Sequence, residues 1–314
     1  MNHEQERNRR VDVVIPTFRP DDKFYRLLEG LRGQRFPISH VWIVNTVVKN
    51  STDTLEPLAD YGDWVSVTEI PSDSFDHGKA RNQGASFSSA DYLLFMTQDA
   101  VPTDDRLVDS LLSPFDDENV AVAYARQLPA LDADCLERLA RAFNYPKNSC
   151  KKGQKDREQL GIKTFFCSNV CALYSRKIFD ELNRFPENMI FNEDMLFASK
   201  AIKNGYFVAY QSEAKVVHSH NYGLRKLLGR YFDLGVSQKQ NAEVFGSLPS
   251  TKEGYRFVKY VFHHLKQQGA WLDMLRFAMQ SAVKYLGFAL GKRYEALPKS
   301  VCRAISSFPG YWRK

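Results

Sequence analysis

Short apolar runs alternate with helical patterns along the first two thirds of the chain. The runs are rich in β-branched and aromatic residues, are too short for helices, and end at proline or polar residues. They are Val11–Pro16, Val41–Thr46, Trp64–Ile70, Tyr92–Met96 and Val120–Ala125. Helical patterns separate them, for example over 21–32 and from Lys79 onwards. Strands and helices alternating at this spacing predict an α/β fold with a mostly parallel sheet between helices.

Two later segments, Thr164–Tyr174 and Lys215–His220, are predicted as further strands, with a helix over 195–204 between them. The stretch from 144 to 163 is basic and contains few apolar residues. We interpret this stretch as a mobile loop that is either a solvated insertion or a grip on an anionic substrate.

The pattern changes at Gly223, after which the chain is helical and basic. Residues 223–314 contain 16 Lys and Arg against 5 Asp and Glu, a net charge of +11, whereas the whole chain carries +6. The sequence therefore predicts two parts, a catalytic α/β domain over 1–222 and an amphipathic helical region over 223–314. That region could rest on an anionic membrane surface, or pack on the body or on a second subunit as a homodimer.

Composition narrows the class of protein. With 314 residues, 44% of them hydrophobic, the chain can bury a full core. Five cysteines without a Cys-x-x-Cys pair argue against a disulfide framework and favour the cytoplasm. The first ten residues contain no apolar run and no stretch of about 18 apolar residues follows, so neither a signal peptide nor a spanning helix is expected. No nucleic-acid-binding motif accompanies the basic charge, and no nucleic acid is expected as a partner.

Asp99 comes shortly after the apolar run Tyr92–Met96, with Thr97 and Gln98 in between. Ligands of open α/β sheets bind at the carboxyl ends of strands, so this carboxylate is a candidate metal ligand. The alternative is that Asp99 caps the helix expected near Asp104. His218 and His220 end a later predicted strand on one face, and imidazole is a usual ligand of divalent metals.

Two further segments carry candidate chemistry. A helix starting near Gly78 would direct its free N–H groups and Arg81 towards an anion, although an ordinary surface helix would look the same. Glu193 and Asp194 stand at the start of a predicted helix, where carboxylates are electrostatically favoured. A carboxylate facing a cleft there could also accept a proton from a hydroxyl nucleophile.

Taken together, these motifs resemble family-two glycosyltransferases of the GT-A fold. The resemblance extends from about Val11 to Gln238. More narrowly, the chain is similar to bacterial dTDP-L-rhamnose-dependent rhamnosyltransferases that build rhamnose-rich cell-wall polysaccharide, chiefly through its Asp76–Gly78 and Thr97–Ala100 motifs. The segments that carry the resemblance are Val14–Phe18, Phe75–Asn82, Phe95–Ala100, Phe191–Asp194 and His218–Tyr222.

The resemblance implies a set of donor-binding residues. Thr17 and Arg19 would border the nucleotide, Asp76 would lie by the base, Arg81 near the diphosphate, and Gln98 would also contact the nucleotide sugar. The chain departs from the family pattern after the second strand, where Asn45–Thr46 stands in place of an acidic residue found in many relatives.

The resemblance also implies the metal and its ligands. Asp99 matches the last carboxylate of the family's Asp-x-Asp motif, but Thr97 stands where the first would be. A bound Mg²⁺ or Mn²⁺ would therefore need His218 or His220, the diphosphate and water as further ligands.

The implied reaction is a single displacement with inversion, in which Asp194, or less favourably Glu193, accepts the proton of an acceptor hydroxyl. The acceptor would be a glycan on a diphosphate-linked polyprenyl lipid, which places the enzyme peripherally at the inner face of the cell membrane. The alternatives are transfer from a UDP-sugar, nucleotidyl transfer, and a non-catalytic module that binds sugar nucleotides or membrane surfaces. The basic, Gly-rich signature of a nucleotidyltransferase is absent after the first strand.

Overall fold

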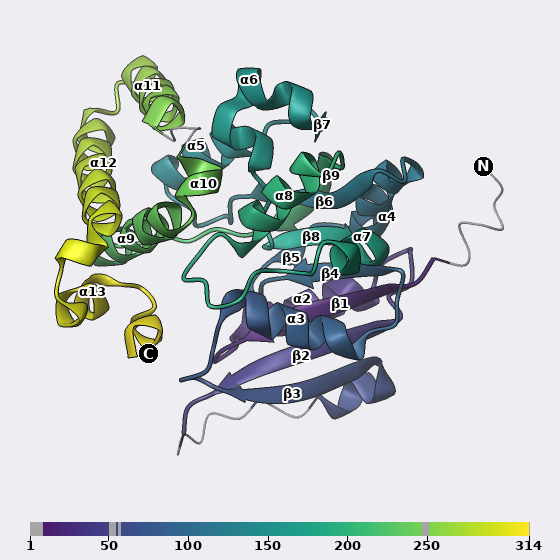
Figure 1. Cartoon of the computed structure of the whole chain (residues 1–314). Helices are drawn as coiled ribbons and strands as arrows, with labels where there is room; N and C mark the ends of the chain where they lie inside the picture. The colour runs from purple at the N-terminus through teal and green to yellow at the C-terminus, as the bar shows by residue number, and fades with distance from the viewer. Residues whose placement is uncertain (1–8, 50–54, 56–57, 247–250, 314) are drawn as a thin grey trace.

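The computed structural model describes residues 9–49, 55, 58–246 and 251–313. Within them a sheet runs in the order β3-β2-β1-β4-β8-β6-β9-β5, and β7 pairs with β9 outside this path (Figure 1). The strands are β1 (Val11–Thr17), β2 (His40–Val47), β3 (Val65–Pro71), β4 (Tyr92–Met96), β5 (Val101–Pro102), β6 (Val120–Leu128), β7 (Cys150–Lys152), β8 (Cys171–Ser175) and β9 (Phe207–Val217).

The sheet is mixed. Its N-terminal half, β3-β2-β1-β4, is wholly parallel, and β8 then enters antiparallel to both β4 and β6. Because β9 runs parallel to β6, strands β1, β2, β4, β6 and β9 all end at the same edge. The short strand β5 pairs Val101 with Val217 and so brings the chain after β4 beside the end of β9.

Side chains alternate along the strands and fill two cores, one on each face of the sheet. Val13 and Ile15 pack on one face with α2 (Asp22–Arg32) and α4 (Leu107–Leu112). Val14 belongs to the other core, together with residues of α3 (His77–Phe87), α7 (Arg176–Glu181) and α8 (Glu193–Lys203). The predicted α/β sheet between helices is confirmed.

The C-terminal region is helical, as predicted, and lies beside the sheet (Figure 1). It consists of α9 (Leu224–Gln240), α10 (Ala242–Phe245), α11 (Thr251–Gln267), α12 (Trp271–Lys292) and α13 (Lys299–Ile305). Helices α9 and α12 approach so closely that a Cβ on Gly291 would lie 2.1 Å from the carbonyl oxygen of Phe232. No helix in the described ranges is both long and apolar enough to cross a bilayer.

Three local predictions are wrong. The strand expected over 215–220 is β9, which ends at Val217, so His218 and His220 lie beyond the strand. The predicted strand over 164–174 is regular only from Cys171, because a 3₁₀ turn occupies Gly161–Phe165 and an irregular loop follows. The stretch over 144–163 is not a plain loop, since it forms β7 and the short helix α6 (Arg157–Leu160). Lys152 is buried there and its ammonium group donates to the carbonyl oxygens of Lys163 and Phe166, which ties the segment down. The prediction about a signal peptide falls mainly on residues 1–8, which lie outside the described ranges.

Candidate active site at the carboxyl edge of the sheet

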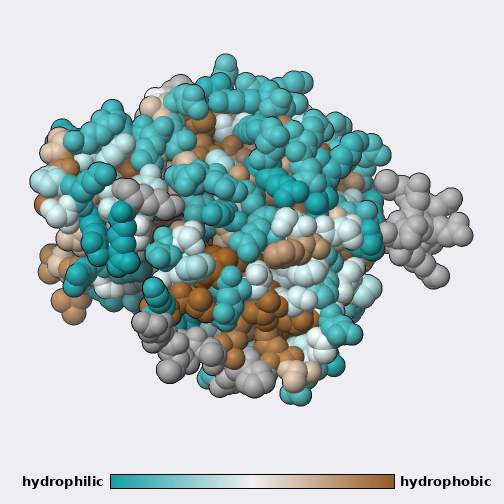
Figure 2. Space-filling view, turned by 60° about the horizontal axis from the view of Figure 1, so that its bottom comes forward, coloured by the Kyte–Doolittle hydropathy of each residue, from teal (hydrophilic) through white to brown (hydrophobic). Residues whose placement is uncertain are grey.

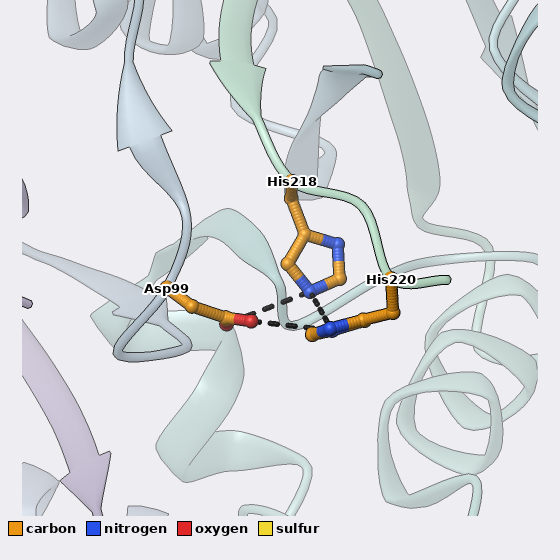
Figure 3. Close-up of side chains that lie close together, drawn as sticks. All are labelled: Asp99, His218 and His220. Carbon is orange, nitrogen blue, oxygen red and sulfur yellow. Dashed lines mark hydrogen bonds and ion pairs between the residues drawn. The ribbon is translucent and has the colours of Figure 1, made fainter. Parts of the chain in front are cut away.

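Asp99, His218 and His220 meet at the carboxyl edge of the sheet and point towards one another (Figure 3). The Nε2 atoms of the two imidazoles are 3.0 Å apart, and the carboxylate oxygens of Asp99 lie 3.5 Å from that of His218 and 3.2 Å from that of His220. Neighbouring ligands of one divalent ion are about 3 Å apart when metal–ligand bonds are about 2.1 Å. The donor set of two imidazoles and one carboxylate therefore fits a single metal ion.

The ring of His218 is oriented from behind by Gln127 on β6. Its Nδ1 donates to the side-chain oxygen of Gln127 at 3.0 Å, and Arg141 donates to the same oxygen. A neutral imidazole that donates through Nδ1 presents the lone pair of Nε2, which is the atom facing Asp99. Burial, aided by the charge of Arg141, lowers the pKa of His218 well below its usual value, so the ring is neutral at physiological pH.

Glu193 opens α8 and forms a buried ion pair with Arg81 of α3 at 3.0 Å. Both side chains are less than one tenth exposed. Burial acts to raise the pKa of Glu193, but the charge of Arg81 and a hydrogen bond from Asn169 outweigh it, and the pKa lies below its ordinary value. Glu193 is therefore an ionised carboxylate whose charge is paired with Arg81 inside the protein.

The neighbouring carboxylate behaves differently. Burial and the negative charge of Glu193 raise the pKa of Asp194 to about 7. Its two oxygens accept from the backbone N–H groups of Asn169, at 3.1 Å, and Met195, at 2.7 Å. Asp194 is thus fixed in position and has a pKa suited to exchanging a proton near neutrality.

The irregular loop before β8 connects the two groups. Asn169 holds Asp194, while its neighbour Ser168 accepts a hydrogen bond from Gln127 at 3.0 Å, and Gln127 holds His218. The side-chain oxygen of Asn169 is itself fixed by the hydroxyl of Tyr174 at 2.7 Å. One short segment therefore contacts the predicted base directly and His218, one of the predicted metal ligands, through Gln127.

Three of the predicted nucleotide residues, Thr17, Arg19 and Gln98, line or support a hollow of about 450 Å³ at the ends of β1 and β2. Arg19 lies on its wall beside Asn45, whose side-chain oxygen accepts from the buried hydroxyl of Thr17 at 3.0 Å. Gln98 exchanges two hydrogen bonds with the backbone of Phe18, at 2.7 and 3.1 Å, and so fixes this loop.

Asp76 and Arg81 have structural partners. The carboxylate of Asp76 caps α3 by accepting from the N–H of Lys79 and also accepts from the N–H of Met189, at 2.7 and 2.9 Å. Burial raises its pKa. The guanidinium group of Arg81 is buried against Glu193 and the carbonyl oxygen of His77. Their expected contacts with base and diphosphate stay predictions.

Sequence reasoning missed Gln127, Arg141 and Asn169, which orient the site. Gln127 lies near the end of a predicted strand, and this position is the only feature of the sequence that could have indicated a role in the site. Asn169 falls within the segment predicted as a strand, and nothing local in the sequence distinguishes it from any other polar residue. These residues gain their roles from contacts between segments far apart in the chain.

Comparison with known proteins places the chain in a family. Residues 12–183 match the family described as Glycosyl transferase family 2. This chain belongs to glycosyl transferase family 2. It is 38% identical over 308 residues to the O-antigen chain rhamnosyltransferase RfbN of Salmonella typhimurium, with 96% of each protein covered. It is 41% identical over 306 residues to the O-antigen chain rhamnosyltransferase WbaN of Salmonella anatum, covering 96% of this chain and 95% of that protein.

Solved structures support the same fold. The mannosyltransferase PcManGT from Pyrobaculum calidifontis, in complex with GDP-Man and Mn²⁺, superposes with a TM-score of 0.61 and 14% identity over 91% of this chain and 88% of that one. S. aureus TarS 1–349 gives a TM-score of 0.56 and 16% identity over 96% and 89%. The GT-A fold expected from the sequence is confirmed.

Breaking the buried pair should destabilise this family 2 protein. We expect Glu193→Gln to lower the free energy of unfolding by about 3–5 kcal/mol, because the charge of Arg81 is left buried without a partner. Urea denaturation measures the loss. The exposed pair of Arg35 and Asp105 is the matched control, and Asp105→Asn should leave the free energy of unfolding nearly unchanged. Equal small losses for the two variants would contradict the assigned role of the pair.

Proposed function

We propose that this protein is an inverting rhamnosyltransferase that moves L-rhamnose from dTDP-L-rhamnose to a hydroxyl of a glycan acceptor carried on a polyprenyl diphosphate. The product belongs to a surface polysaccharide such as O-antigen. One observation carries the proposal: the loop before β8 contacts a carboxylate with a raised pKa through Asn169 and, through Ser168 and Gln127, one imidazole of a metal-type cluster. The identity with two O-antigen chain rhamnosyltransferases over nearly the whole chain supports the choice of sugar.

Asp194 is the base in this reaction. Its carboxylate accepts the proton of the acceptor hydroxyl while that oxygen attacks the anomeric carbon of rhamnose. The bond from that carbon to the diphosphate oxygen breaks at the same time, and dTDP leaves with the bonding electron pair. Attack from the face opposite to dTDP inverts the configuration at the anomeric carbon.

Asp99, His218 and His220 would hold Mg²⁺ or Mn²⁺. When bound, the ion supplies positive charge that stabilises the negative charge developing on the departing diphosphate. The hollow beside Phe18, Arg19 and Asn45 accommodates the nucleotide at the adjacent strand ends.

The proposal is tested by offering dTDP-L-rhamnose, UDP-glucose, UDP-galactose and UDP-N-acetylglucosamine to a lipid-linked glycan acceptor, with and without Mn²⁺. We expect turnover of dTDP-L-rhamnose, loss of turnover on chelation, and a decrease of at least about 100-fold for Asp194→Asn, the range of general base catalysis. Chromatography and mass spectrometry of the product measure transfer. Use of a UDP-sugar would remove the rhamnosyl assignment, and donor binding without any transfer would indicate a binding module.

The rate should depend on pH through Asp194. The base acts only when ionised, so kcat/KM should fall on the acid side of about pH 7, by up to tenfold per pH unit. Glu193 contributes to the raised pKa, and Glu193→Gln should therefore move this acid limb to lower pH. Asp60→Asn, on the exposed surface, is the control. An acid limb near pH 4 in the unaltered protein would contradict the role of Asp194 as base.

The C-terminal region presents an exposed surface suited to a lipid acceptor. The apolar stripe of α12 lies at the left edge of the molecule, where hydrophobic residues reach the surface (Figure 2). It consists of Trp271, Leu272, Leu275, Met279, Tyr285 and Leu286, each about half exposed or more. The outer face of α11 adds basic residues, namely Lys252, Arg256, Lys259 and Lys266. Two copies of the chain would repel one another through these charges, whereas an anionic bilayer attracts them.

Membrane binding through this stripe is testable with phosphatidylglycerol vesicles. We expect Leu272→Glu/Leu275→Glu to weaken binding at least about tenfold, because burying each leucine is worth about 1.5–3 kcal/mol. Flotation measures the bound fraction, and Val67→Glu, an exposed site on β3, is the control. If the double variant binds vesicles normally but changes from dimer to monomer in sedimentation, the stripe is a dimer contact instead.

A further inference from the structure

Arg230, which belongs to the C-terminal region, lies beside the candidate site. It lies on α9, and its guanidinium carbon is 5.2 Å from the ring centroid of Tyr222 and 5.4 Å from that of Phe191. The two rings belong to different segments, so the guanidinium group bridges them. Cation–π contacts of this kind orient the group without using its N–H donors.

One of the two aromatic rings contacts a candidate metal ligand, and the other belongs to the segment that carries the candidate base. The ring of Tyr222 stacks on that of His220, with centroids 4.8 Å apart and planes 18° from parallel. Phe191 immediately precedes Asn192, Glu193 and Asp194. Arg230 is therefore joined on one side to the candidate metal ligands and on the other to the segment that carries the candidate base.

Helix α9 is fixed against that segment. Ser237, two turns after Arg230, donates its hydroxyl to the carbonyl oxygen of Phe191 at 2.7 Å and accepts from the side-chain amide of Asn192 at 3.1 Å. The glycine contact of α9 with α12 holds the helix from its outer side. The place of Arg230 is thus determined by the contacts that α9 makes with its neighbours.

The guanidinium group of Arg230 forms no ion pair in the described part of the chain. Arg81 and Arg141 pair with Glu193 and Glu137, at 3.0 and 2.7 Å, but Arg230 has no carboxylate within ion-pair distance and no hydrogen bond among the described residues. A half-buried guanidinium group with unused donors is suited to bidentate contact with phosphate oxygens. The sequence predicts that Arg81 lies near the diphosphate, but its guanidinium group is already paired with Glu193.

We propose that Arg230 binds a substrate diphosphate between the candidate metal ligands and the base. This inference rests on the proposed function and assigns α9 to the catalytic site. The nucleotide-sugar donor and the lipid-linked acceptor both carry a diphosphate. We expect Arg230 to bind that of the donor, because a leaving diphosphate must lie beside the metal ion.

The test is calorimetric titration of the full chain with dTDP in the presence of Mg²⁺, without any acceptor. We expect Arg230→Gln to weaken dTDP binding by about 10- to 100-fold, the worth of a charge-assisted hydrogen bond. Arg230→Lys should recover part of the affinity, since it keeps the charge but loses the fork. Arg225→Gln, an exposed arginine on the same helix, is the matched control and should bind dTDP normally.

Kinetics with each substrate varied separately distinguish the two diphosphates. Unchanged dTDP affinity with a raised KM for the lipid-linked acceptor would assign Arg230 to the acceptor diphosphate. Unchanged values for both substrates in Arg230→Gln would overturn the inference, while rhamnosyl transfer by the unaltered protein would keep the proposed function. Failure of the unaltered protein to bind dTDP would instead count against the proposed function itself. Thermal unfolding at the same temperature as the control variant shows that the fold is intact.

Discussion

The buried ion pair between Arg81 and Glu193 is the interaction on which the candidate site depends. Two adjacent carboxylates at one helix start repel each other, and their burial penalises both charges. Arg81 stabilises the charge on Glu193, and the charge of Glu193 in turn disfavours ionisation of Asp194. The two neighbours thereby separate into a structural anion and a carboxylate with a pKa of about 7. The same pair joins α3 to α8 across the face of the sheet.

The second requirement is an irregular backbone before β8. In a regular strand the N–H of Asn169 would pair with a neighbouring strand, but here it is free to hold the carboxylate of Asp194. Ser168 accepts from the side-chain amide of Gln127 and so turns the oxygen of that amide towards Nδ1 of His218. The tautomer of His218 therefore depends on the same loop. A single short segment without repeating structure therefore contacts both Asp194 and Gln127, the residue that orients His218.

The sequence allowed prediction of those features that follow from local pattern and strand direction. Apolar runs identified β1, β2, β4 and β6, and because parallel strands end at one edge, Asp99, His218 and His220 could be expected to meet. Burial of Arg81 could not be predicted in this way. Its position in the first turns of α3 suggested an anion in solution, whereas the anion is a side chain of a distant helix. The strand expected over 164–174 failed for a similar reason, since Asn169 uses its backbone N–H and its side chain on Asp194 and Glu193 of a distant helix.

The chain becomes basic at Gly223, but the residues after this point still belong in part to the candidate site. Helix α9 follows it directly, yet Ser237 is hydrogen-bonded to the segment that precedes Glu193 and Asp194. On its other side α9 meets α12 through glycines, where the backbones touch and no side chain can yield. Two helices in such close contact have little room to shift against one another. A surface bound to the outer face of α12 would therefore fix the orientation of the site, and the region rich in basic residues would join acceptor placement to catalysis.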